Sequence, residues 1–161
     1  MGNGTVQGGS ASGDGGLDDN VTVIDEVTGL ANGRGFLEIL HLEERRHARY
    51  GGTPILVMVD VNQLLASKPD AEQAERLVEI AAVLADCIRD TDTLARVDDH
   101  RFGILAIQAG CSAASIVGRL RLNLELRRIH QVDVTVGEPG SLVTAWQALD
   151  GPARPTLRLV R

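Results

Sequence analysis

A short polar turn between two apolar segments constrains the fold of this chain more than any other feature of its sequence. Residues 94–105 read LARVDDHRFGIL, so apolar residues flank the polar run from Asp98 to Arg101. Two apolar runs joined by a tight turn are typical of a β-hairpin. The pattern therefore predicts strands near residues 93–97 and 101–108.

Apolar spacing along the rest of the chain predicts alternating helices and strands. A helix over residues 71–89 is indicated by apolar residues spaced as on one helix face, namely Leu77, Ile80, Ala81, Leu84 and Ile88. The continuous apolar run that ends at Asp60 predicts a central strand over residues 54–60. We also expect a loop over 63–70, helices over 34–49, 112–128 and 141–149, and strands over 132–136 and 155–160. This order predicts an α+β fold, in which helices pack on one mostly antiparallel sheet.

The composition indicates a single domain preceded by a tail. Residues 1–19 are mostly Gly, Ser and Asp and cannot bury enough surface to order themselves. We expect a disordered tail or an artificial extension there, and the domain over residues 20–161. The net charge of −6 argues against nucleic acid as a partner, although local arginines can still hold a small anion. No apolar run is long enough for membrane insertion, so we expect a cytoplasmic protein.

The cysteines and the single tryptophan have simple structural interpretations. Cys87 and Cys111 lie in or beside apolar segments and are expected to be buried free thiols. Neither they nor the histidines show zinc-ligand spacing, so no metal site is expected. Trp146 is expected to pack against the core.

The hairpin and several separated segments resemble the GGDEF (diguanylate cyclase) domains of bacterial signal transduction. In that family the hairpin carries an Arg, a spacer, two glycines, two acids and a Phe, and here Arg96 and Phe102 are kept. The family's turn before its first helix is matched here by Asp25, Thr28, Gly29, Leu30, Asn32 and Arg34. The resemblance covers about residues 25–137. It implies a palm-like, ferredoxin-like core with a central, mostly antiparallel sheet flanked by helices.

The same resemblance implies that the cyclase chemistry has been removed. Family members join two GTP molecules into cyclic di-GMP, using divalent metal held by carboxylates. Asp60 keeps the first carboxylate, but Asp98 and Asp99 replace the glycines, and His100 and Arg101 replace the acids. The family's phosphate-binding Lys and guanine-binding Asn and Asp correspond to Leu65, Lys68 and Ala74. We therefore expect a degenerate, non-catalytic domain with no cofactor and no productively held Mg²⁺.

Several of the retained residues also have a purely structural interpretation. Asp60 closes a buried strand, where an acid can simply cap or solvate the sheet edge. Turn chemistry is sufficient to explain the polar and glycine residues before the first helix, namely Asp25, Thr28, Gly29 and Asn32.

A candidate ligand site remains just before the hairpin. Many family members bind cyclic di-GMP at a second site, an Arg-x-x-Asp, and Arg89 and Asp92 show that pattern in the same register. A guanidinium can donate two parallel hydrogen bonds to guanine, and the carboxylate can accept from guanine or orient the Arg. A second arginine from the next helix commonly helps, and Arg119 and Arg121 are nearest to that position. The same Arg-x-x-Asp is also ordinary helix-end chemistry.

Three functions are compatible with these residues. The leading one is a cyclic di-GMP receptor that regulates a partner protein or neighbouring domain, with a homodimer as a further option. The alternative is a ligand-free protein-interaction or dimerisation module. The third, which has less support because the phosphate and guanine contacts are lost, is GTP binding without turnover.

Overall fold

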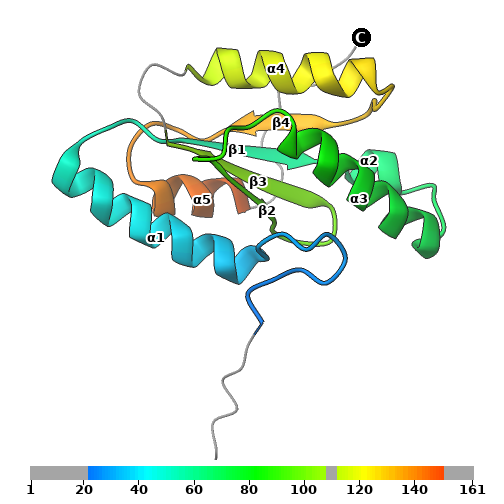
Figure 1. Cartoon of the computed structure of the whole chain (residues 1–161), viewed down its shortest axis with the longest axis horizontal. Coiled ribbons are helices and arrows are strands. Elements are labelled where there is room, and N and C mark those ends of the chain that lie inside the picture. Colours follow the sequence, from blue (N-terminus) through cyan, green and yellow to red (C-terminus); the bar gives the residue numbers. More distant parts are fainter. Residues whose placement is uncertain (1–21, 108–111, 151–161) are drawn as a thin grey trace, which may run out of the picture.

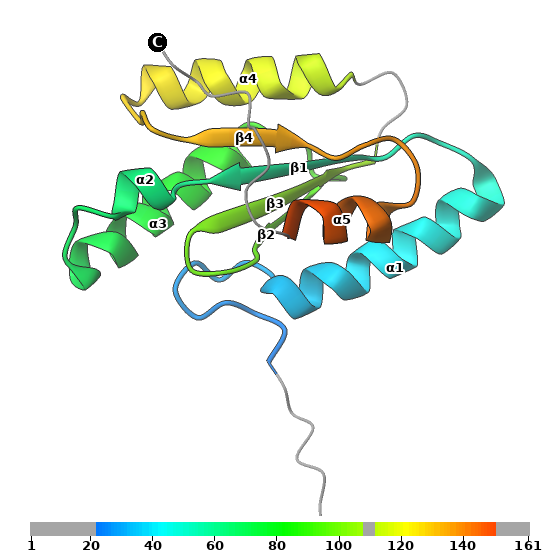
Figure 2. The ribbon, with the colours of Figure 1, turned by 180° about the vertical axis from the view of Figure 1, so that it is seen from behind.

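Strands and helices alternate along the described part of the chain. The computed structural model describes residues 22–107 and 112–150, and Figures 1 and 2 show it from opposite sides. The strands are β1 (Ile55–Asp60), β2 (Thr93–Arg96), β3 (Arg101–Ala106) and β4 (Asp133–Val136). The helices are α1 (Gly33–Tyr50), α2 (Asn62–Leu65), α3 (Asp70–Ala85), α4 (Ala113–Leu126) and α5 (Leu142–Asp150).

The four strands form one antiparallel sheet in the order β2-β3-β1-β4. Between β1 and β4 the elements follow the pattern strand, helix, strand, strand, helix, strand, with β1 in the interior, as in ferredoxin-like folds. In the register, Asp60 at the end of β1 lies opposite Arg101 of β3 and Asp133 of β4. The predicted α+β architecture with an antiparallel ferredoxin-like sheet is confirmed.

Helices cover both faces of this sheet (Figures 1 and 2). Val57 and Val59 of β1 belong to the core cluster under α3 and α4. Leu56 and Met58 alternate with them and belong to the cluster under α1 and α5, as the two-residue period of a strand requires. On that second face Trp146 packs edge-on against Phe36, with ring centroids 5.5 Å apart. The expected packing role of Trp146 is confirmed.

Two predicted boundaries were wrong. The expected loop over 63–70 begins with the helical turn α2, because the Asp60 carboxylate accepts the Asn62 amide and Val61 O accepts the Leu65 amide. The helix expected over 71–89 ends at Ala85. Beyond it, tighter turns form in which the Cys87 amide bonds to Leu84 O. The apolar periodicity continues through these turns although the α-helical hydrogen bonding has stopped.

The remaining predictions differ in how far the structure tests them. Cys87 is buried as a free thiol, as expected. The tail over 1–19, the strand expected over 155–160 and Cys111 lie outside the described residues. Within residues 22–107 and 112–150, no helix combines the length and apolarity needed to span a membrane.

Candidate functional site

The turn before α1 is joined to the hairpin by an ion pair. Asp25 Oδ2 accepts hydrogen bonds from the amide and hydroxyl of Thr28, at 2.8 and 2.7 Å. Its Oδ1 accepts from Arg96 Nη1 at 2.8 Å, and Arg96 Nη2 donates to the carbonyl of Asp99 at 3.1 Å. Asn32 caps α1 by accepting the Gly35 amide. The turn residues are therefore structural, as expected, but sequence reasoning missed the pair between Asp25 and Arg96.

Inside the hairpin turn, the substituted residues bind one another. Asp98 Oδ1 accepts the His100 amide at 3.0 Å, and Asp98 Oδ2 accepts from Arg101 Nε in an ion pair. Burial alone would raise the pKa of Asp98, but these two hydrogen bonds and the Arg101 charge hold that pKa below its ordinary value. Asp98 replaces the first glycine of the family's hairpin, and Arg101 replaces its second acid. The negative charge of Asp98 is thus neutralised by the positive charge of Arg101.

Arg101 also connects the hairpin to α5 through a hydrogen bond. Its Nη1 donates to the carbonyl of Leu149, at 3.2 Å, in the last turn of that helix. A cation at a helix C-terminus satisfies a carbonyl that lacks an intrahelical partner and interacts favourably with the helix dipole. Arg101 and Leu149 are 48 residues apart, so no local sequence pattern could have indicated this contact.

The carboxylates around the turn do not fit the metal of a cyclase. Asp60 Oδ1 accepts the Asn62 amide at the start of α2, at 2.8 Å, a contact that the sequence did not indicate. The second carboxylate position holds His100, whose ring is a poor ligand for a hard cation, and Arg101 adds a positive charge in place of another acid. Within residues 22–107 and 112–150, no group of three His, Cys, Asp or Glu side chains could hold a metal ion.

The positions aligned with the family's GTP contacts are used for packing and for a surface ion pair. Leu65 is 3% exposed and belongs to the core cluster under α3 and α4, so it offers nothing to a phosphate. Lys68 Nζ lies 3.6 Å from Glu72, and its carbonyl accepts from the side chain of Gln73. These residues stabilise the start of α3.

The Arg-x-x-Asp segment forms a closed turn with an exposed arginine. The Asp92 amide donates to Arg89 O at 2.9 Å, and the Asp92 carboxylate accepts the Arg89 amide at 3.0 Å and the Ile107 amide at 3.2 Å. Asp92 therefore ties the turn to the end of β3. The Arg89 side chain is exposed and pairs with no acid in the described part of the chain. The structure thus brings the two predicted residues together and gives them different roles.

Only one of the two accompanying arginines lies on the side of α4 that faces this turn. The Arg119 carbonyl is 4.0 Å from Cys87 Sγ, two residues before Arg89. Burial and the nearby Asp86 raise the pKa of the Cys87 thiol, and the Arg119 charge opposes them. Residues two apart on a helix point about 200° apart. Arg121 therefore projects from the opposite flank of α4.

Comparison with protein-family models identifies the domain. Residues 22–137 match the model described as "Diguanylate cyclase, GGDEF domain". This segment extends from the turn before α1 to just beyond β4, so it contains all four strands of the sheet. A search of curated protein sequences found no match.

Solved GGDEF structures share the fold. The chain is similar to the diguanylate cyclase SiaD of Pseudomonas aeruginosa, solved with its activator SiaC, at 25% identity and a TM-score of 0.57, over 80% of this chain and 59% of SiaD. The FimX GGDEF domain from the same organism is 17% identical with a TM-score of 0.66, over 79% and 88% of the two chains. The DgcB GGDEF domain from Caulobacter crescentus, solved with c-di-GMP, is 16% identical with a TM-score of 0.62, over 80% and 85%. The chain thus spans less than two thirds of SiaD, and its likeness to FimX and DgcB concerns the fold.

Proposed function

We propose, since this chain belongs to the GGDEF family of diguanylate cyclase domains, that it is a non-catalytic member that binds cyclic di-GMP at the Arg89–Asp92 turn and so regulates a partner domain or protein. The observation that carries this proposal is the exposed Arg89 side chain on a turn that Asp92 holds closed. Such a turn presents a guanidinium in a fixed place without neutralising it.

The loss of catalysis is inferred from how the active-site positions are occupied. Asp98 and Arg101 pair with each other, and the turn has neither the glycines nor the two acids of the family's hairpin. Without the glycines, the Cβ atoms and the Asp98 and Asp99 charges lie where a triphosphate would approach. Leu65 is buried in place of the family's phosphate-binding Lys. A single substitution could be compensated, but these changes remove metal, phosphate and glycine contacts together.

The chemistry of the Arg89 turn matches the proposed ligand. Cyclic di-GMP combines guanine bases with negatively charged phosphodiesters, and a guanidinium can donate two parallel hydrogen bonds to guanine O6 and N7 or stack on its plane. Arg119 adds a second cation on the flank of α4 that faces the end of α3. The Asp92 oxygens each accept one backbone amide, and a carboxylate oxygen has a second lone pair for a guanine N–H.

This turn is spatially separate from the degenerate hairpin turn. Arg89–Asp92 precedes β2 and the Asp98–Arg101 turn follows it, so the two lie at opposite ends of a strand four residues long. That corresponds to about 13 Å along the strand. Substitutions in the Asp98–Arg101 turn can therefore occur without disturbing the Arg89–Asp92 turn. Among the relatives, the DgcB domain was solved with c-di-GMP and SiaD with an activator protein, which supports both a nucleotide ligand and a protein partner here.

Calorimetric titration with cyclic di-GMP tests the proposal. We expect saturable binding to the unmodified chain and loss of binding in Arg89→Ala. The matched control is Arg34→Ala, which removes another exposed arginine, on α1. Arg119→Ala should weaken binding, whereas Arg121→Ala should leave it unchanged. No heat at high micromolar ligand, or equal binding by Arg89→Ala, would contradict the proposal.

The alternative is a ligand-free interaction module, and one observation favours it. Leu122 and Leu126 lie one turn apart on α4 and are 56% and 71% exposed, which is the kind of apolar surface that a partner covers. Self-association or partner binding that persists without nucleotide and in Arg89→Ala would favour this alternative. Thermal stabilisation by GTP would instead revive nucleotide binding without turnover.

A further inference from the structure

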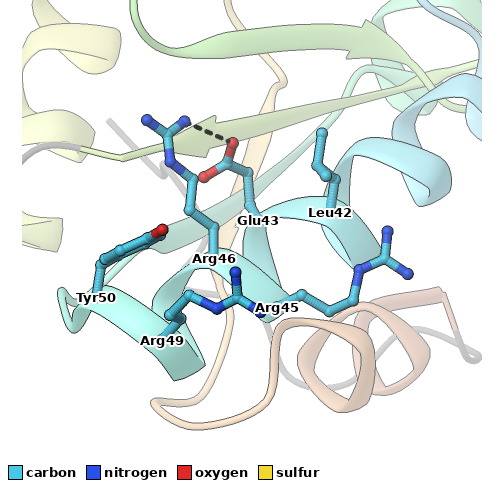
Figure 3. Close-up of a pocket in the computed structure, with 6 residues that line it drawn as sticks. All are labelled: Leu42, Glu43, Arg45, Arg46, Arg49 and Tyr50. Carbon is cyan, nitrogen blue, oxygen red and sulfur yellow. Dashed lines mark hydrogen bonds and ion pairs between the residues drawn. The ribbon is translucent and has the colours of Figure 1, made fainter.

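The second half of α1 carries a hollow that the proposed ligand site does not use. It has a volume of about 430 Å³ and is lined by Leu42, Glu43, Arg45, Arg46, Arg49 and Tyr50 (Figure 3). All six residues come from one helix, over two turns, and all of them except Glu43 are exposed. The hollow lies on the α1 side of the sheet, whereas the Arg89 turn follows α3 on the other side (Figure 1).

The hollow is positively charged although the chain as a whole is negative. Three guanidiniums line it, against one acid, Glu43. Glu43 is only 6% exposed, and its Oε1 lies 3.4 Å from Arg46 Nη1 (Figure 3). Its charge is therefore paired with that of Arg46. Arg45 and Arg49 are exposed and pair with no acid within residues 22–107 and 112–150. The hollow therefore has an uncompensated positive charge on a chain whose net charge is −6.

Two exposed apolar side chains flank these arginines. Leu42 is 55% exposed and Tyr50 is 75% exposed. An exposed tyrosine beside arginines is typical of the central contacts of protein interfaces, where Tyr and Arg contribute most of the binding energy. An aromatic ring also loses few rotamers on binding, so ordering Tyr50 costs little conformational entropy.

We propose that this face of α1, defined by Leu42, Arg45, Arg46, Arg49 and Tyr50, docks an acidic segment of a partner protein that carries an apolar side chain. Its carboxylates would pair with Arg45 and Arg49, and its apolar side chain would rest between Leu42 and Tyr50. The lining extends over eight residue steps of helix, which is about 12 Å and suits two turns of a partner helix. Charge complementarity identifies the class of partner.

The observations disfavour a lipid surface as the occupant. Stable membrane binding needs a broader apolar face than one leucine and one tyrosine, and the negative net charge opposes approach to an anionic bilayer.

The test is fluorescence anisotropy with a labelled synthetic helical peptide in which glutamates and leucines alternate on one face. We expect saturable binding that weakens as salt is raised, because the contacts are between exposed charges. In Arg45→Glu/Arg49→Glu the affinity should fall at least about tenfold. In Tyr50→Ala it should fall while the salt dependence stays. Both arginines are exposed and unpaired, so the charge-reversed variant should fold like the unmodified chain.

Matched controls separate this face from net charge. Arg34→Glu/Arg128→Glu makes the same change in charge at two other exposed arginines and should bind the peptide normally. A peptide with lysines for glutamates should not bind. Equal binding by both double variants, or no binding of the acidic peptide, would overturn the proposal. So would Arg45- and Arg49-dependent binding to phosphatidylserine vesicles, or self-association, in place of peptide binding. None of these outcomes affects the cyclic di-GMP test, because Arg89 is unchanged.

Discussion

At the scale of single residues, the hairpin turn is held by contacts between its own side chains and backbone. Asp98 is partly buried, yet it remains ionised because it accepts the His100 amide and pairs with Arg101. The same balance acts on Asp25, because burial opposes its ionisation while Thr28 and Arg96 favour it. In both cases the net effect holds the carboxyl pKa below its ordinary value.

These two acids predict how stability depends on pH. A carboxyl whose pKa is lower in the folded chain contributes stability that is fully present above its unfolded pKa, about 3.9. That contribution is lost as pH falls through the folded pKa. We therefore expect urea denaturation to give a nearly constant contribution from Asp25 and Asp98 above about pH 5 and a declining one below about pH 4. Asp98→Asn should be less stable at neutral pH and should lose less on acidification.

The control for this measurement is Asp99→Asn. The Asp99 side chain is exposed, and only its carbonyl is used, by Arg96. This variant should follow the unmodified chain at every pH. If Asp98→Asn showed the same acid dependence as the unmodified chain, the pair with Arg101 would contribute no stability.

Gly103 is required for a close approach between the hairpin and α1. A Cβ at this position would lie 2.6 Å from Cε1 of Phe36, a fully buried ring. We expect Gly103→Ala to lower the free energy of unfolding by about 1–3 kcal/mol, as overpacking does. Gly118→Ala is the matched control, since its Cβ would meet nothing within 4 Å. It should raise stability by about 0.5–1 kcal/mol, because alanine favours helix. If thermal and urea unfolding showed the same change in stability for Gly103→Ala as for Gly118→Ala, the Phe36 ring would have moved aside to make room for the new Cβ.

At the scale of elements, Asp92 joins the turn that follows α3 to the residue that follows β3. Its carboxylate accepts amides from Arg89 and Ile107, which are 18 residues apart. Asp92→Ala should cost about 1–2 kcal/mol in urea denaturation, because two backbone donors lose their acceptor. It should also weaken cyclic di-GMP binding, whereas Arg89→Ala should weaken binding alone. Asp90→Ala, an exposed change in the same turn, should affect neither. Unchanged stability in Asp92→Ala would refute the role assigned to this carboxylate.

The sequence predicted elements well where one local signal determines them. The apolar run ending at Asp60 and the hairpin flanks predict β1, β2 and β3, because burial on a sheet leaves a direct pattern in composition. The sequence predicts a helix that extends beyond Ala85, because Ile88 keeps the apolar spacing and packs against the core after the α-helical hydrogen bonds stop. The short α2 escaped detection because four residues are too few to show a period.

The candidate site was predictable only in part, because a sequence shows local patterns but not contacts between separate elements. The Arg89 and Asp92 pattern is local and could be found by spacing, but the contact of Asp92 with Ile107 joins different elements. The same holds for Asp25 with Arg96, 71 residues apart, and for Arg101 with α5. The hollow on α1 lies on one helix. Its charge was visible in the sequence, but whether Glu43 was free or buried depended on packing.

At the scale of the whole molecule, the substitutions at the family's cyclase positions lie at several separated places. The hairpin turn lies beside the end of β1, where the Val61 amide donates to His100 O, while Leu65 lies in the core and Arg101 fastens α5. Restoring the turn alone cannot restore the phosphate contacts. It would also remove the Asp98–Arg101 pair and the bond from Arg101 to Leu149.

A reverted hairpin is therefore predicted to be less stable and still inactive. The variant carries Asp98→Gly, Asp99→Gly, His100→Glu and Arg101→Glu. Its free energy of unfolding should fall by about 1–3 kcal/mol, because an ion pair and a helix-end hydrogen bond are lost. Incubation with GTP and Mg²⁺, followed by chromatography of the nucleotides, should show no cyclic di-GMP. Calorimetry should find its affinity for added cyclic di-GMP unchanged, because Arg89 and Asp92 lie at the other end of β2. Synthesis of cyclic di-GMP by the reverted variant would show that the turn alone had silenced the domain.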